Sequence, residues 1–115
     1  MPTEKNVLSG NMTMLVLKLL DGKDMYGYQI IEELAEKSEQ VFQLKTGTLY
    51  PLLHGLEKSG MVISYEEHAP GQKMRRYYQL TKQGRGLLAE KQASWNAYTK
   101  VVGEIMMGGE SYALA

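Results

Sequence analysis

The chain has 115 residues, with 13 basic side chains, 13 acidic side chains and no cysteine. This length supports one domain with a modest core, and the lack of cysteine excludes disulfide scaffolds, thiolate metal sites and cysteine nucleophiles. Because the formal net charge is zero, the distribution of charge along the chain is a better guide to partners than its sum.

The first two predicted elements are helices joined by a short turn. Helical spacing of apolar residues predicts a helix from about Leu8 to Leu20, and Asp21-Gly22 is expected to end it, with the glycine in the left-handed conformation. Asp24 is then the expected N-cap of a second helix over Met25 to Ser38. On the inner side of that helix, Gly27 is expected to let another helix backbone approach closely.

The third predicted helix begins near Thr46, its expected N-cap, and ends at Gly60. Four leucines share one face: Leu49, Leu52, Leu53 and Leu56. The opposite face carries small, hydrogen-bonding or basic residues: Gly47, Thr48, Tyr50, Pro51, His54 and Lys58. Such a helix can bury one side in a core and place the other in a DNA major groove. Pro51 lies just beyond the first turn and is expected to bend or loosen the start of the helix.

Two strands are predicted next, over Met61–Glu67 and Arg75–Leu80, with a turn at Pro70-Gly71. Alternation along the second strand places Arg75 and Arg76 on opposite sides. The side shared by Arg76 and Leu80 is expected to face the core, which leaves Arg75 as the less constrained arginine. Residues 69–89 contain five basic residues and no acidic one, so this region can offer a basic face to phosphates, although an ordinary mixed surface is the alternative.

Thr81 is expected to cap a last helix that reaches about Met107, roughly 40 Å long at 1.5 Å per residue. Its apolar positions repeat with a seven-residue rhythm and are predicted to bury themselves against a second copy of the chain. These predicted dimerisation residues are Leu88, Trp95, Tyr98, Val102 and Ile105.

Four motifs together resemble the PadR family of bacterial transcriptional regulators, in particular its short members with a single C-terminal helix. They are Tyr26–Ile30 (YGYQI), Gly47–Leu53 (GTLYPLL), Leu56–Val62 (LEKSGMV) and Arg75–Thr81 (RRYYQLT). The resemblance implies a mostly α fold with a small β-hairpin, namely a winged helix-turn-helix with a long C-terminal dimerisation helix. It also implies a homodimeric repressor that binds an inverted-repeat operator.

The expected organisation has three parts. Residues 1–80 form the winged helix-turn-helix, residues 81–107 form the dimerisation helix packed on the same unit, and residues 108–115 form a flexible tail. No signal peptide or membrane span is evident, so we expect a cytoplasmic protein with no membrane contact.

The candidate DNA-binding residues lie on the third helix and the hairpin. They are Lys45, Thr46, Thr48, Tyr50, His54, Lys73, Arg75 and Arg76. Helix N-termini favour phosphates, threonine can contact base edges, and the basic residues of the wing can reach phosphates or a minor groove. The alternative for Thr48 and Tyr50 is that they serve only capping and packing.

Trp95 is the single tryptophan and lies midway along the last helix. Packing is the preferred interpretation for this large side chain. The alternative is a pocket for a small planar aromatic effector at the dimer interface, with Tyr98, Met12 and Leu15 as neighbours, as some multidrug-responsive members of the resembled family have.

The sequence contains no constellation of residues typical of an enzyme. Its two histidines have no metal-ligand spacing, and no nucleophile motif or phosphate-binding glycine loop is present. We therefore expect no catalytic activity, metal or cofactor, and a regulator that binds double-stranded DNA. The competing interpretation is a winged-helix module that binds protein and does not read DNA.

Overall fold

The computed structural model describes residues 4–68 and 70–108. Within these residues, four helices and three short strands follow one another: α1 (Glu4–Gly22), β1 (Met25–Tyr26), α2 (Gly27–Lys37), α3 (Thr46–Lys58), β2 (Val62–Glu67), β3 (Arg75–Leu80) and α4 (Lys82–Met106). The fold is therefore mostly helical with a small antiparallel sheet, as the sequence predicted.

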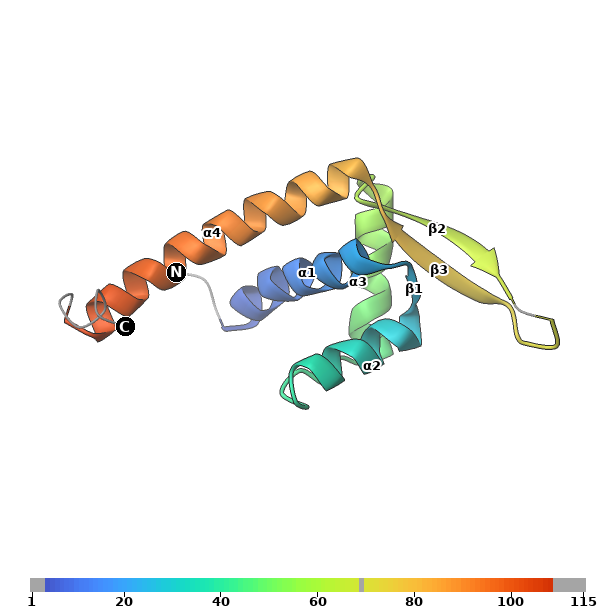
Figure 1. The fold of residues 1–115 in the computed structure, drawn as a ribbon, viewed down its shortest axis with the longest axis horizontal. Helices are drawn as coiled ribbons and strands as arrows, with labels where there is room; N and C mark the ends of the chain where they lie inside the picture. Colours follow the sequence, from blue (N-terminus) through green and yellow to red (C-terminus); the bar gives the residue numbers. More distant parts are fainter. Residues whose placement is uncertain (1–3, 69, 109–115) are drawn as a thin grey trace.

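The molecule is elongated, with extents of 60 × 28 × 27 Å. Figure 1 shows a head made of α1, α2, α3 and the hairpin, from which α4 runs out on one side while the tip of the hairpin projects on the other. The 25 residues of α4 span about 37 Å at 1.5 Å per residue. Most of the length of the molecule therefore comes from this one helix.

The sheet has the strand order β1-β3-β2, with antiparallel pairing throughout. The two hairpin strands were predicted, but β1 was not, because the sequence predicted that Met25 would start a helix. Met25 instead pairs with Tyr78 and is buried in the core. A strand of two residues is too short to produce an alternating pattern, so only its long-range partner reveals it.

The first helix ends at Gly22, as predicted, but the conformation expected of this glycine and the capping role expected of Asp24 are wrong. Among the described glycines, those with positive φ are Gly60, Gly71 and Gly108, so Gly22 does not close α1 in the left-handed conformation. The Asp24 carboxylate does not cap a helix. It accepts hydrogen bonds from the hydroxyl of Tyr65 (2.6 Å) and the amide of Gln79 (3.2 Å), which join the turn after α1 to the hairpin.

The core lies between α1, α2, α3 and the sheet. Three of the four leucines on the predicted inner face of α3 are buried, namely Leu49, Leu53 and Leu56, and Leu52 is partly buried against them. The first part of α4 also belongs to this core, since Leu88 exposes only 6% of its surface. Leu88 was predicted to contact a second copy, and this is a correction, because its own chain already covers it.

The C-terminus of α3 was predicted correctly. Gly60 has a φ of 81°, its N–H donates to the Glu57 carbonyl, and the N–H of Met61 donates to the Leu56 carbonyl (2.8 Å). This is the Schellman arrangement, which satisfies the last carbonyls of a helix and turns the chain sharply. The hairpin therefore leaves α3 in a fixed direction.

The predicted N-cap of α3 is wrong, and the predicted N-cap of α4 is confirmed. Lys45, not Thr46, is the N-cap of α3, and it makes no side-chain capping bond. Thr81 caps α4 as predicted, because its hydroxyl oxygen accepts from the N–H of Gly84 (3.0 Å). The same hydroxyl donates toward the carbonyl of Gly60 (2.7 Å), so this cap also fixes α4 to the end of α3.

In the described part of the chain, no helix combines the length and the apolarity that a membrane crossing requires. The predicted flexible tail over residues 108–115 falls, apart from Gly108, outside the described residues.

Candidate nucleic-acid interface

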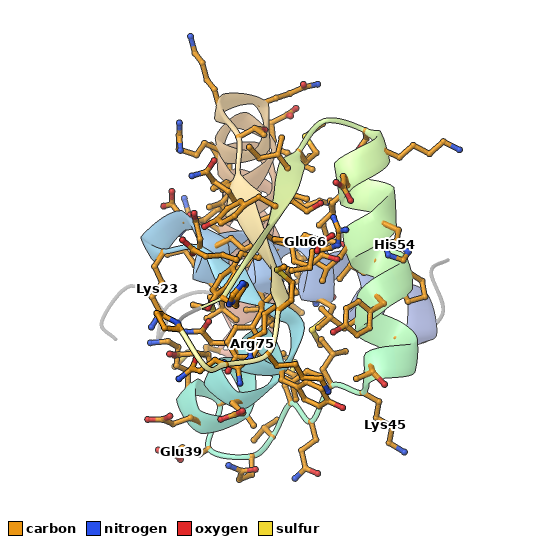
Figure 2. The ribbon with its side chains drawn as sticks, turned by 90° about the vertical axis from the view of Figure 1, so that its right-hand side faces the viewer. Lys23, Glu39, Lys45, His54, Glu66 and Arg75 are labelled. Atoms are coloured by element: carbon orange, nitrogen blue, oxygen red, sulfur yellow. The ribbon has the colours of Figure 1, made fainter. Side chains whose placement is uncertain are left out.

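One side of α3 is left uncovered by the head. Lys45 at its start, Thr48 in its first turn and His54 further along are all exposed, while the leucines on the other side anchor the helix in the core. In Figure 2, Lys45 and His54 lie along the outer side of α3 and Arg75 lies on the hairpin, which projects outward from the head in Figure 1. Three of the predicted DNA-binding residues are therefore exposed on α3 or at its start.

Tyr50 and Thr46 differ from these three because both are only partly exposed. The hydroxyl of Tyr50 packs against Gly27 so closely that a Cβ at Gly27 would collide with it. Gly27 therefore makes room for a tyrosine side chain, and not for the helix backbone that the sequence led us to expect. The Tyr50 ring also lies 6.4 Å from that of His54, measured between centroids. Tyr50 thus packs within the helix-turn-helix while part of its side chain remains exposed.

The connection between α2 and α3 was not predicted in detail. Glu39 and Gln40 both have positive φ, 51° and 70°, which is uncommon for residues other than glycine. The turn is held by a hydrogen bond from the Gln40 N–H to the Ala35 carbonyl (2.8 Å) and by one from the Phe42 N–H to the Ser38 hydroxyl (2.9 Å). These bonds fix the direction in which α3 begins.

The outer face of the hairpin carries an aromatic cluster that the sequence did not predict. The rings of Tyr65 and Tyr77 stack at 5.7 Å between centroids, and Tyr26 meets Tyr77 edge-on at 5.5 Å. The hydrogen bond from Tyr65 to the Asp24 carboxylate, together with desolvation, raises the pKa of Tyr65 to about 12. The cluster joins β1, β2 and β3 through side chains.

Arg75 belongs to this outer face, as strand alternation predicted. Its guanidinium lies 4.4 Å from the centroid of the Tyr26 ring, a cation–π contact that keeps the charge unneutralised. Arg75 also lines a shallow pocket with Lys73, Tyr77 and Glu67. Among the described residues, no carboxylate forms an ion pair with Arg75 within 4.0 Å, so its charge remains available to an external anion.

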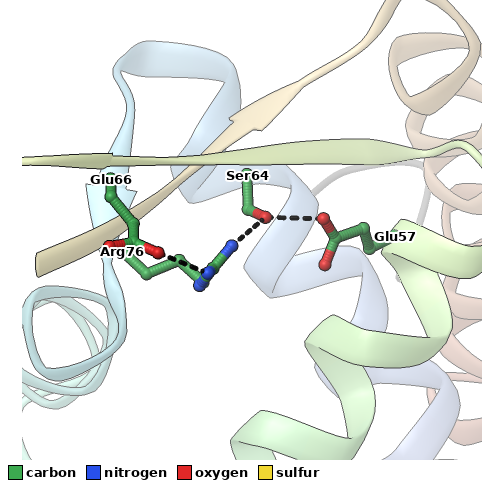
Figure 3. Close-up of polar contacts among 4 residues, drawn as sticks. All are labelled: Glu57, Ser64, Glu66 and Arg76. Atoms are coloured by element: carbon green, nitrogen blue, oxygen red, sulfur yellow. Dashed lines mark hydrogen bonds and ion pairs between the residues drawn. The ribbon is translucent and has the colours of Figure 1, made fainter.

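Arg76 lies on the opposite face and has different surroundings. Its guanidinium forms an ion pair with Glu66 (2.8 Å) and donates to the hydroxyl of Ser64 (2.9 Å). The Ser64 hydroxyl in turn donates to the carboxylate of Glu57 on α3 (2.5 Å), as Figure 3 shows. Two neighbouring arginines that were both predicted to contact DNA therefore have different surroundings in the fold. In the observed register Glu66 lies opposite Arg76 and Glu67 lies opposite Arg75, so cross-strand pairing alone would not have told the two arginines apart.

The distal part of α4 exposes large apolar side chains. Trp95 is 39% exposed and Ile105 73% exposed, and Tyr98 and Val102 are exposed between them. Two further apolar residues, Val101 and Met106, are exposed beside this stripe and were not predicted. We call the six residues the distal stripe: Trp95, Tyr98, Val101, Val102, Ile105 and Met106.

The predicted ligand-binding residues fall into two groups. The Trp95 and Tyr98 rings lie 6.1 Å apart between centroids, tilted by 32°. Met12 and Leu15, by contrast, are partly buried and pack against the core of the head. Within the described residues, no group of three or more histidine, aspartate or glutamate side chains is arranged to hold a metal ion.

Comparison with known proteins agrees with the resemblance drawn from the motifs. Residues 16–90 match the transcriptional regulator PadR-like family. The transcriptional regulator Rv3488 of Mycobacterium tuberculosis is 32% identical over 89 residues, which cover 77% of this chain and 76% of that protein.

Two solved structures illustrate the similarity of fold. A transcriptional regulator from Clostridium thermocellum superposes with a TM-score of 0.78 and 32% identity, covering 85% of this chain and 95% of that one. A PadR family transcriptional regulator from Eggerthella lenta gives a TM-score of 0.73 and 33% identity, with coverages of 87% and 81%. The predicted winged helix-turn-helix with a long C-terminal helix is therefore confirmed.

Proposed function

Since the chain belongs to the PadR-like family of transcriptional regulators, we propose that it represses transcription as a homodimer bound to an inverted-repeat DNA operator. The family consists of DNA-binding regulators and not of enzymes. The repressor mode, the operator symmetry and the residues that contact DNA are the parts that we propose.

The observation that carries the proposal is the uncovered side of α3, on which Lys45, Thr48 and His54 are exposed. The hairpin that projects from the same head carries Arg75, which forms no ion pair with a described carboxylate (Figure 2). Thr48 and His54 would meet base edges in the major groove. Lys45 and the first amides of α3, at Thr46, would meet a phosphate, since helix N-termini attract anions. Lys73 and Arg75 are placed to contact the backbone on the flank.

Dimerisation is proposed to use the distal stripe. An apolar stripe on a helix is stable only when it is covered, and a second α4 packed against the first would cover both. This assigns residues 81–107 to the dimer interface and residues 1–80 to DNA binding. Two-fold symmetry would then place the two α3 helices in successive major grooves, about 34 Å apart.

We also propose a planar aromatic effector at this interface. Trp95 and Tyr98 present adjacent rings on an exposed surface, and aromatic side chains favour stacking with flat ligands. Titrating the dimer with planar aromatic compounds should change the emission of Trp95 and weaken DNA binding. A broad panel of such compounds that changes neither property would exclude this part of the proposal.

The function is tested by DNA selection and footprinting. A random duplex pool selected with the wild-type protein should yield an inverted repeat, and the dimer should protect a matching site upstream of a regulated promoter and reduce transcription from it. Thr48→Ala, His54→Ala and Lys45→Gln should each weaken binding to the selected duplex. Lys100→Gln, an exposed change on the distal part of α4, is the control for charge and should leave binding unaltered.

The competing function is a winged-helix module that binds protein. The two are separated by salt, because each phosphate contact steepens the fall of affinity with salt concentration. A steep negative log–log slope for the selected duplex supports DNA binding. Failure to enrich any duplex, with a folded dimer in hand, would instead favour the protein-binding module.

A further inference from the structure

We propose that Ser64 is a positioning residue that sets the angle between the hairpin and α3, through a polar chain that runs from Glu57 to Ser64 to Arg76 to Glu66. We call this chain the wing brace. The proposal rests on the proposed DNA-binding function and adds a structural determinant of its specificity. It also assigns Arg76 to the brace and not to a DNA phosphate.

The wing brace connects three elements, α3, β2 and β3, through four side chains. Glu57 comes from α3, Ser64 and Glu66 from β2, and Arg76 from β3, and Figure 3 shows the four side chains in one continuous row. The Ser64 hydroxyl is the link, because it donates its proton to Glu57 and accepts from Arg76. A hydroxyl has one proton and two lone pairs, so both roles are filled at the same time.

The position of Ser64 along the hairpin explains why this link can act on the wing. In the ladder, Ser64 faces Tyr78, whose side chain is fully buried, so the backbone at Ser64 is anchored to the head. β1 pairs with β3 only at Tyr77 and Tyr78, and beyond that point the hairpin is two-stranded. Ser64 is therefore placed at the base of the projecting part of the wing.

The charges of the brace compensate one another. Arg76 faces Glu66 directly across the strands and reaches Glu57 through Ser64. An exposed arginine whose charge is compensated by a carboxylate at 2.8 Å attracts a phosphate less strongly than an unpaired one. Exposed ion pairs of this kind add little stability. We therefore expect the brace to affect the angle between the hairpin and α3 more than the free energy of unfolding. Phosphate contacts fix the register of a protein on DNA, and they require a wing at a set angle.

The test compares Ser64→Thr with Ser64→Val, which have the same shape and the same net charge and differ by a hydroxyl. Both residues are compatible with a strand. The probe is the duplex that selection with the wild-type protein enriches, measured beside a shuffled duplex of equal length and composition. Ser59→Ala is the matched control, since its hydroxyl bonds only to carbonyls of the last turn of α3.

Ser64→Thr and Ser59→Ala should bind the selected duplex as the wild type does. Ser64→Val should bind it about tenfold more weakly, because each wing, without the two hydrogen bonds of Ser64, must be ordered at its angle when DNA binds. Its affinity for the shuffled duplex and its salt slope should be unchanged, because no charge is altered. Hydrogen exchange at the amides of Glu66 and Arg76 should be faster in the valine variant alone.

Three results would overturn the proposal. Ser64→Val could bind the selected duplex as tightly as Ser64→Thr, or it could lose the same affinity for the selected and the shuffled duplex. The third is an equal rate of hydrogen exchange at these amides in the two variants. Ser64→Ala repeats the comparison in case valine unfolds the hairpin. A wild-type protein that enriches no duplex contradicts the proposed function itself, and this is seen before any variant is made.

Discussion

The head and the distal part of α4 carry the same kind of amphipathic pattern but complete it differently. In the head, Leu53 on α3 and Leu88 on α4 are buried by other elements of the same chain. Further along α4, Val102 and Ile105 continue the apolar stripe and remain exposed. An amphipathic period therefore shows which face of a helix must be covered, but it does not show whether the cover comes from the same chain or from a second copy.

Charges placed on the distal stripe test most directly whether a second copy covers it. We expect Val102→Glu combined with Ile105→Glu to raise the dimer dissociation constant at least about a thousandfold, or about 4 kcal/mol, since carboxylates would be buried without partners in both protomers. Sedimentation equilibrium measures the effect. The head should keep its circular dichroism spectrum, because neither residue belongs to its core.

Asn96→Glu is the matched control, since Asn96 is exposed and helical spacing puts it on the side of α4 away from the stripe. It should remain dimeric. If the double variant stays dimeric at the same protein concentration, the distal stripe is not the interface.

A second change acts on the head alone. A Cβ at Gly84 would collide with the carbonyl oxygen of Met61 and with Leu80, whereas a Cβ at Gly86 would meet nothing within 4 Å. We expect Gly84→Ala to lower the free energy of unfolding by about 3 kcal/mol, because backbone must move to admit the methyl group. Gly86→Ala should raise it by about 0.5–1 kcal/mol, because alanine favours the helix over glycine.

Urea unfolding at one fixed protein concentration measures both variants, since dimerisation contributes to apparent stability. The two glycines test whether α4 is packed tightly against the head at Gly84 and is open to solvent at Gly86. Equal effects of the same sign at the two positions would contradict it.

A third change separates the two arginines of the wing. Arg75→Gln should reduce the log–log salt slope of DNA binding by about 0.9 per protomer, or about 1.8 for a dimer, as expected for one lost phosphate contact each. Arg76→Gln should reduce it by less than half as much, because Glu66 already neutralises that charge. Titrations of the selected duplex at several salt concentrations measure both slopes. Equal reductions would mean that both arginines contact phosphates.

The parts of the fold that the sequence predicted are those fixed by neighbouring residues. The inner face of α3, its end at Gly60 and the Thr81 cap each depend on a signal within a few positions. The strand at Met25 and the role of Asp24 depend instead on Tyr78 and Tyr65, more than 40 positions away. Local spacing contains no information about such partners, which is why these two predictions failed.

The candidate site divides in the same way. Strand alternation correctly placed Arg75 and Arg76 on opposite faces of β3. What alternation could not give was the network around Arg76, because Glu57 and Ser64 come from other elements and meet it only in the folded chain. Similarly, the packing of Tyr50 against Gly27 depends on how α2 crosses α3.

The smallest expected effect is on the titration of Tyr65, whose hydroxyl donates to the Asp24 carboxylate and joins the hairpin to the turn after α1. The pKa of Tyr65 is raised to about 12 by Asp24, so the phenol should keep its proton about two pH units beyond the usual value of about 10. A raised pKa means that the stabilisation is complete below pH 10 and is lost as the pH rises through 12. The contribution of this group to stability should therefore be fully present near neutral pH and should not vary with pH there.

Carbon-13 NMR of the tyrosine ring carbon bonded to the hydroxyl measures this titration directly. Tyr65→Phe identifies the resonance by removing it, and Asp24→Asn should move its midpoint down toward 10, because the hydrogen-bonded carboxylate is the largest cause of the shift. A Tyr65 resonance in the wild type that already titrates near 10 would mean that the bond to Asp24 is not formed in solution. The hairpin would then be held to the head without this bond, by β1 pairing, ring stacking and the buried side chains of Tyr78 and Leu80.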